Sequence, residues 1–160
     1  AAYDKGHTIG MHTYSHDYAK VYASVDAYFQ DLDQIGQMVQ EEIGYVPCFI
    51  RFPGGSSNTV SKKYTAGIMS TLVQEVQNRG YQYYDWNGSS GDGSVRTTEE
   101  LVAQATSFDS NNIILLCHDS HGKQTTVEAL PQIIEHYQSL GYTFKALDRD
   151  SFVAHHGVNN

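Results

Sequence analysis

Apolar residues recur along this chain at two spacings, one typical of helices and one typical of strands. The helical spacing is clearest between residues 24 and 42, where Ser24 is a suitable N-cap and Gly44 a suitable end. Two further segments with this period are followed by Gly80 and Gly141, which are typical helix ends. The sequence predicts four helices, at residues 24–42, 61–79, 98–108 and 125–140, the third capped by Thr97 or Thr98.

Short apolar runs separate these helices and are predicted to be strands. They cover residues 7–12, 48–52, 81–86, 113–117 and 142–147. The run at 113–117 is almost continuously apolar, which is typical of a strand buried on both faces. Because strands and helices alternate, the pattern predicts an α/β fold with parallel strands, although it does not separate a barrel from an open sheet. No repeat or linker interrupts residues 1–160, so we expect a single domain.

The composition narrows the range of partners. The formal net charge is -8 and no cluster of Lys or Arg occurs, so neither nucleic acid nor an anionic membrane surface is expected as a partner. No apolar run is long enough to form a transmembrane segment. The twelve tyrosines suit contact with carbohydrate, but buried tyrosine is equally normal. Cys48 and Cys117 each lie in an apolar run, which favours two buried free thiols and leaves a disulfide open.

Polar side chains stand at the C-terminal ends of four predicted strands, where the loops of α/β proteins build their sites. These residues are His12 and His16, Arg51, Asp85 and Trp86, and His118. His12 and His16 lie four residues apart, so one helical turn would bring both imidazoles to one cation. Catalytic zinc usually has three protein ligands, so the pair would need a third. Taken alone, two solvated histidines are the simpler alternative.

His118 and Arg51 each allow two interpretations. His118 directly follows the run at 113–117 and suits proton transfer near neutral pH, or it caps a strand end through its own hydrogen bonds. The guanidinium of Arg51 could bind a carboxylate through two hydrogen bonds, or Arg51 could be an ordinary surface arginine. Its apolar neighbours in the sequence favour the first interpretation. The sequence contains no G-x-S-x-G motif, which argues against a serine hydrolase of the common α/β type.

Four short segments, "HTYSH", "RFPGG", "WNGSSGD" and "LLCH", occur in an order and spacing that resemble the polysaccharide deacetylases. This family is also described as the NodB-homology domain or carbohydrate esterase family four. Its second motif, H-[ST]-x-x-H, is matched by His12, Thr13 and His16. Its third motif, R-x-P-[YF]-G, is matched by Arg51, Pro53 and Gly55. Its fifth motif, L-x-H, is matched by Leu116 and His118. In the third motif Gly54 replaces the aromatic residue.

The fourth motif of the family, W-x-x-D-x-x-D-W, is matched only in part. Laid on Trp86, it has Ser89 at the first Asp, Asp92 at the second and Gly93 at the last Trp. The carboxylate that the family places beside its acid histidine would therefore have to come from Asp92 or Asp85.

The first motif of the family, T-F-D-D-G-P, is absent from the chain. It carries the aspartate that acts as general base and the aspartate that completes the metal site. We expect both upstream of Ala1, in a βα unit of about 30 or more residues. On this expectation the chain is an N-terminally incomplete domain with little or no activity of its own, and its exposed barrel edges favour self-association.

The resemblance implies a distorted (β/α) barrel and a hydrolase that removes acetyl groups from an N-acetylated glycan. Peptidoglycan N-acetylglucosamine is expected ahead of chitin-like chains, and removal of O-acetyl groups from xylan is a variant of the same chemistry. A deacetylase-like module that binds glycan without hydrolysis is the alternative from another class. A glycan substrate implies an extracellular or cell-surface location.

The resemblance also implies a role for each matched residue. A divalent metal, zinc ahead of cobalt, nickel or manganese, would bind His12 and His16 and polarise the acetamide carbonyl. The other implied roles are orientation of the base (Arg51), stabilisation of the oxyanion by a backbone N–H (Gly54), protonation of the leaving amine (His118), an apolar pocket for the acetyl methyl (Trp86 and Leu116) and contact with the sugar (Tyr14).

Overall fold

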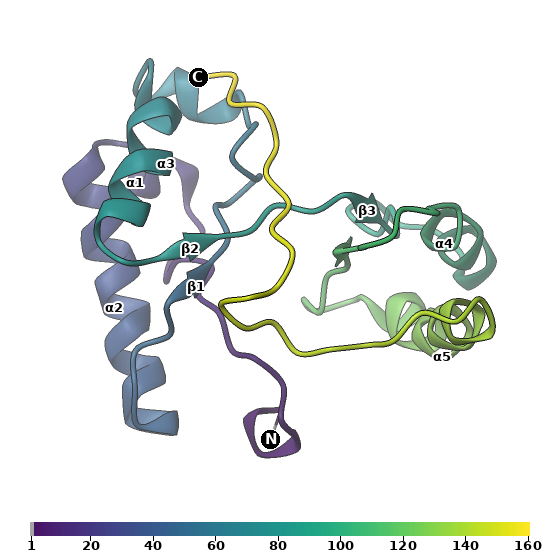
Figure 1. Cartoon of the computed structure of the whole chain (residues 1–160). Coiled ribbons are helices and arrows are strands. Elements are labelled where there is room, and N and C mark those ends of the chain that lie inside the picture. Colours follow the sequence, from purple (N-terminus) through teal and green to yellow (C-terminus); the bar gives the residue numbers. More distant parts are fainter. Residues whose placement is uncertain (1) are drawn as a thin grey trace. The chain divides into compact units, whose positions relative to one another are not determined.

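The computed structural model describes residues 2–160, which form two compact units. The first unit comprises the chain up to Asp85 together with residues 146–160, and the second unit spans residues 86–145. Each unit contains helices and its own short parallel sheet (Figure 1). The expectation of one domain across residues 1–160 stays a prediction. Among residues 2–160, no helix combines the length and apolar character needed to cross a membrane.

The first unit is built around three parallel segments of chain. β1 (Phe49–Ile50) pairs with β2 (Gln82–Tyr83). Met11 forms a parallel bridge to Ile50, and its backbone bonds to Phe49 and Arg51 use the edge of β1 that faces away from β2. The parallel order agrees with the alternation of elements in the sequence, but only Met11 of the strand predicted at 7–12 takes part in pairing.

Five helices belong to the described part of the first unit: η1 (Tyr3–Lys5), α1 (Tyr18–Val21), α2 (Val25–Ile43), η2 (Val60–Lys63) and α3 (Ile68–Asn78). α2 matches its prediction because both ends are signalled locally. The Ser24 hydroxyl accepts from the N–H of Ala27, and Gly44 ends the helix with φ 87°. α2 and α3 lie together on one side of β1 and β2 (Figure 1), and they pack around a core that includes Met11, Tyr28, Leu32, Phe52 and Leu72.

The second unit pairs two helices with a minimal sheet. α4 (Thr98–Ala105) packs against α5 (Gln124–Ser139), and β3 (Gly88–Ser89) pairs with β4 (Leu115–Leu116). Thr97 and Glu100 form a reciprocal capping box at the start of α4. The hydrophobic core of this unit contains Leu101, Ala105, Ala129, Ile133 and Tyr137.

Several predicted elements differ from the structure for identifiable reasons. The helix predicted at 61–79 is interrupted, because Gly67 has φ 77°, a left-handed conformation that does not continue a right-handed helix. The run at 113–117 pairs only at β4 and is half-buried, not buried on both faces. The run at 142–147 forms no strand, and the Leu147 carbonyl accepts from the hydroxyl of Thr8. α1 and β3 were not predicted.

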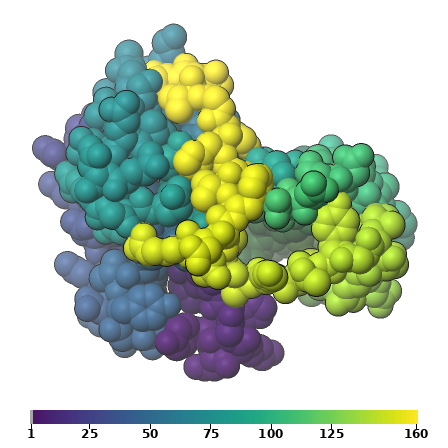
Figure 2. Space-filling model, viewed as in Figure 1, coloured from purple at the N-terminus to yellow at the C-terminus, as the bar shows by residue number. Residues whose placement is uncertain are grey.

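The C-terminal segment returns to the first unit. Asn160 caps α3, since its carbonyl accepts from the N–H of Ser70 (2.8 Å) and its side-chain oxygen accepts from the N–H of Gly67 (2.7 Å). Figure 2 shows this segment, in yellow, against the teal surface of α3. Cys48 and Cys117 are both free thiols and half-buried.

Candidate active site

The two histidines of the H-x-x-x-H pair lie close together, but not through a helical turn. The ring centroids of His12 and His16 are 4.9 Å apart, and the rings are inclined by 58°. Thr13 and His16 have φ 65° and 50°, and residues 12–16 contain no helix. The expected helical geometry is therefore wrong. A left-handed turn brings the two imidazoles together instead.

His12 is oriented in the manner of a metal-binding histidine. Its Nδ1 lies 2.7 Å from the carbonyl oxygen of Arg51. A carbonyl only accepts, so Nδ1 carries the proton and Nε2 carries the lone pair, an arrangement common among metal-ligating histidines. The ring of His16 meets Tyr18 edge to face at 5.8 Å.

Two neutral imidazoles at this separation fit as two ligands of one divalent cation. Within residues 2–160, no group of three or more His, Cys, Asp and Glu side chains is arranged to hold a metal ion. The third ligand was expected upstream of Ala1, which lies outside the described residues.

Arg51 directs its guanidinium into the first unit. Its Nε donates to the carbonyl of Tyr84 (3.2 Å) and a terminal nitrogen donates to the carbonyl of Asp85 (3.4 Å). Burial lowers the pKa of Arg51, and the negative charge of Asp85 acts in the opposite direction. The side chain is half-buried, so its position is not that of an ordinary surface arginine.

Asp85 is fully buried at the end of the segment that carries β2. One carboxylate oxygen accepts from the N–H of Ser56 (2.8 Å), and the other accepts from the Ser56 hydroxyl and from the N–H of His156 (2.8 Å). Asp85 thus joins the loop after β1 to the C-terminal segment. All of these contacts lie in the first unit, and none involves His118.

The loop after Arg51 requires glycine at position 54. Gly54 has φ 77°, and a Cβ there would lie 2.7 Å from the hydroxyl of Tyr18 and 3.0 Å from the Cβ of Asn58. The hydroxyl of Tyr22 donates to the carbonyl of Pro53 (2.7 Å), which anchors the same loop. In this chain Tyr18 occupies the space beside position 54, so a side chain at that position would collide with it.

In the second unit, Asp92 is paired with His118. One oxygen of this buried carboxylate lies 2.7 Å from Nδ1 of His118, and the other accepts from the backbone N–H of His118 (2.6 Å) and from the hydroxyl of Thr126 (2.9 Å). Burial acts to raise the pKa of Asp92, but the hydrogen bonds from His118 and Thr126 outweigh it and hold the pKa below its ordinary value. Of the two candidate carboxylates, Asp92 is the one in contact with His118.

The other predicted site residues are Trp86, Leu116 and Tyr14. Trp86 and Leu116 are both half-buried in the second unit, where the carbonyl of Leu116 accepts from the N–H of Ser90 (3.0 Å). Tyr14 is 50% exposed, and its backbone N–H binds Asp31. The apolar pocket for an acetyl methyl and the sugar contact of Tyr14 stay predictions.

A sequence model of the polysaccharide deacetylase family matches residues 1–84, more than half of the chain. The chain belongs to the polysaccharide deacetylase family. A peptidoglycan-N-acetylglucosamine deacetylase of Bacillus cereus is 26% identical over 157 residues, which cover 92% of this chain and 52% of that protein. A chitin deacetylase of Arthroderma benhamiae is 32% identical over 133 residues, 81% of this chain and 33% of that protein. This deacetylase-family chain thus spans about half or less of these curated relatives.

Solved structures of the same family share the fold. The catalytic domain of a peptidoglycan N-acetylglucosamine deacetylase from Eubacterium rectale is 44% identical, with a TM-score of 0.94 over 99% of this chain and 73% of that one. A carbohydrate esterase family four esterase from Streptococcus mutans is 26% identical, with a TM-score of 0.75 over 90% of this chain and 64% of that one. The predicted α/β fold of the polysaccharide deacetylase type is confirmed.

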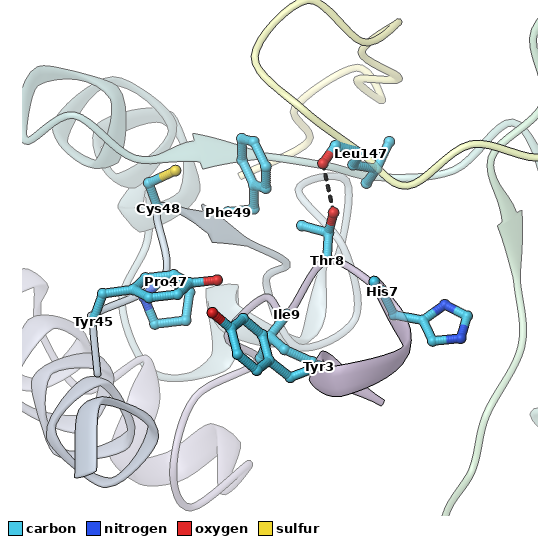
Figure 3. Close-up of a pocket in the computed structure, with 10 residues that line it drawn as sticks. Tyr3, His7, Thr8, Ile9, Tyr45, Pro47, Cys48, Phe49 and Leu147 are labelled. Carbon is cyan, nitrogen blue, oxygen red and sulfur yellow. Dashed lines mark hydrogen bonds between the residues drawn. The ribbon is translucent and has the colours of Figure 1, made fainter. Parts of the chain in front are cut away.

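A separate cavity of about 320 Å³ opens in the first unit of this deacetylase-family chain (Figure 3). Its wall includes Ile9, from the chain before Met11, and Phe49, which precedes Ile50 in β1. His12 and Arg51 follow these paired residues. Because the paired segments are parallel, the cavity lies at the opposite end of them from His12 and Arg51, and it is not part of the candidate site.

Sequence motifs did not reveal the residues that hold these loops in place. Ser56 and His156 bind Asp85, and Asp31 binds the backbone of the loop between the two histidines. Asp31 is an ordinary polar position of a helix in the sequence, and His156 is separated from Asp85 by 71 residues. No local spacing signals either contact.

Proposed function

We propose that this chain forms part of a metal-dependent hydrolase that removes acetyl groups from N-acetylated glycans. Peptidoglycan N-acetylglucosamine is the preferred substrate class, followed by chitin-like chains, because relatives carry both activities in their names. Such a glycan lies outside the cell, so the protein acts at the cell surface or beyond it.

The observation that carries the proposal is the Asp92–His118 pair. Asp92 fixes the proton on Nδ1 of His118, so Nε2 is the nitrogen that exchanges a proton with substrate. In its imidazolium form His118 carries a second proton on Nε2, and when the C–N bond of the acetamide breaks, His118 gives that proton to the departing amine nitrogen. The side chain of His118 is 43% exposed, so a polymer can reach it.

The first unit supplies the groups that act on the acetamide carbonyl. When bound to His12 and His16, a divalent metal, zinc ahead of cobalt, nickel or manganese, supplies Lewis-acid polarisation of that carbonyl. The backbone N–H of Gly54 donates to the oxyanion of the tetrahedral intermediate. Arg51 would orient the carboxylate of the general base, which is expected upstream of Ala1. That base would take the proton from the water that adds to the carbonyl carbon.

Acetate release tests this function most directly. The protein in its longest encoded form is assayed with zinc on N-acetylated chito-oligosaccharides, peptidoglycan and acetylated xylan. His118→Ala should lower the rate by about 100-fold or more, as expected for loss of a general acid. His121→Ala, an exposed histidine of the same segment, is the matched control and should keep the rate of the unchanged protein.

Two outcomes would contradict the proposal. Equal rates for His118→Ala and the unchanged protein would remove His118 from the chemistry. Glycan binding without acetate release from any of the three substrates would favour the non-hydrolytic binding module. The 160-residue chain alone should release little acetate, and activity equal to that of the longer form would refute a base upstream of Ala1.

A further inference from the structure

The turn between His12 and His16 is held in an unfavourable conformation. Thr13 has φ 65° and His16 has φ 50°, in the left-handed region that side chains with a Cβ avoid, and for β-branched Thr13 this is rare. Such conformations are unfavourable and persist only where their surroundings enforce them. The buried hydroxyl of Thr13 also has no hydrogen-bond partner among the described residues, which adds to the cost.

One carboxylate on another element offsets this cost. Asp31 accepts from the backbone N–H of Tyr14 at 2.6 Å and from that of Ser15 at 3.2 and 3.3 Å. These are the two residues between the strained positions. Hydrogen bonds to an ionised carboxylate are about twice as strong as neutral ones, so Asp31 is well suited to stabilise the turn.

Asp31 is itself firmly placed. It lies inside α2, a 19-residue helix capped by Ser24. Its neighbour in sequence, Leu32, is fully buried in the core of the first unit. A carboxylate on a packed helix can impose a backbone conformation on a loop, whereas a mobile side chain cannot.

We propose that Asp31 is a positioning residue that holds the turn so that His12 and His16 are presented together to a divalent cation. The carboxylate does not contact the metal. It acts through the backbone of Tyr14 and Ser15, and it keeps the imidazole rings at their separation of 4.9 Å before any cation binds. This inference rests on the proposed function in one respect, namely that His12 and His16 are metal ligands.

The metal affinity of the full chain provides the test, with Co²⁺ as the probe. Titrations followed by calorimetry and visible absorption compare the unchanged chain with Asp31→Asn, Asp33→Asn and His12→Ala. Asp33→Asn removes the same charge from the exposed side of the same helix, so it measures the effect of charge alone. Circular dichroism establishes that each variant is folded.

Asp31→Asn should weaken Co²⁺ binding by about 10-fold or more, the range found for residues that orient metal ligands. Asp33→Asn should change the affinity by less than a factor of two. Hydrogen exchange at the amides of Tyr14 and Ser15 should accelerate in Asp31→Asn only. These two changes together would distinguish a positioning role from a general contribution to stability.

The outcomes separate this inference from the proposed function. Equal Co²⁺ affinity in Asp31→Asn and the unchanged chain, or equal losses in Asp31→Asn and Asp33→Asn, would overturn the inference alone. Absence of Co²⁺ binding, or binding that His12→Ala leaves intact, would overturn the inference and the metal site of the proposed function together. A specific loss in Asp31→Asn without acetate release from the longest form would support the inference while the proposed function fails.

Discussion

Replacing Asp85 by alanine should destabilise the first unit severely. Asp85 is fully buried and accepts from the N–H and the hydroxyl of Ser56, which is itself fully buried, and from the N–H of His156. Alanine leaves the two Ser56 donors without a partner and away from water, and each orphaned buried donor costs about 1–3 kcal/mol. His156 is half-buried, so its N–H is the one donor that can turn to solvent.

The two orphaned donors together give an expected loss of about 2–6 kcal/mol, a large part of the total stability of an ordinary domain. Ser56→Ala removes only one side-chain bond to the carboxylate and should cost about 1.5–3 kcal/mol. A double-mutant cycle with Ser56→Ala should show that the two losses are not additive, because both variants break the same bond.

Urea denaturation followed by far-UV circular dichroism measures these losses. For a urea m-value of about 2 kcal/mol/M, a loss of 4 kcal/mol lowers the midpoint by about 2 M. Asp119→Ala, at an exposed carboxylate, is the control and should stay within about 0.5 kcal/mol of the unchanged chain. A loss below 1 kcal/mol for Asp85→Ala, or strict additivity with Ser56→Ala, would refute this account of the buried carboxylate.

Three further predictions address other parts of the chain. Thr97→Ala removes the capping box of α4 and should cost about 1 kcal/mol in urea denaturation. The pKa of Asp92 is lower in the folded chain than its ordinary value of 3.8. Its contribution to stability is therefore present above pH 3.8 and is lost as the pH falls through the folded pKa. Asp92→Asn should flatten the dependence of stability on pH below about pH 4. Gly54→Ala should cost at least about 1–2 kcal/mol from its positive φ, and less in a Tyr18→Phe background if the hydroxyl contact matters.

The ends of a helix could be predicted only where the residues that cap it lie next to it in the sequence. α2 was predicted almost to the residue because Ser24 and Gly44 are local signals. The start of α3 was missed because Gly67 supplies no side-chain cap and the capping group is Asn160, 93 residues away in the sequence. A periodicity of apolar residues contains no information about a cap from a distant segment.

In the candidate site, too, local features could be predicted from the sequence and contacts with distant residues could not. Residue type and spacing pointed to His12, His16 and His118 as candidates. They did not predict the backbone between the first two histidines, which depends on a carboxylate of α2. The sequence also left Asp85 and Asp92 as alternatives beside His118. The choice between them depends on packing, since Asp92 contacts His118 and Asp85 binds Ser56.

The first unit is assembled from two stretches of sequence, and this affects the order in which it is completed during translation. Asp85 accepts a hydrogen bond from the N–H of His156, which is synthesised 71 residues later. At about 5–20 residues per second, the ribosome needs roughly 4 to 14 s to synthesise that interval. Over this time the nascent unit has a buried carboxylate with an incomplete set of donors and an α3 whose N-terminus lacks its cap. We therefore expect the first unit to be less stable until residues 156–160 have been added than it is once they are in place.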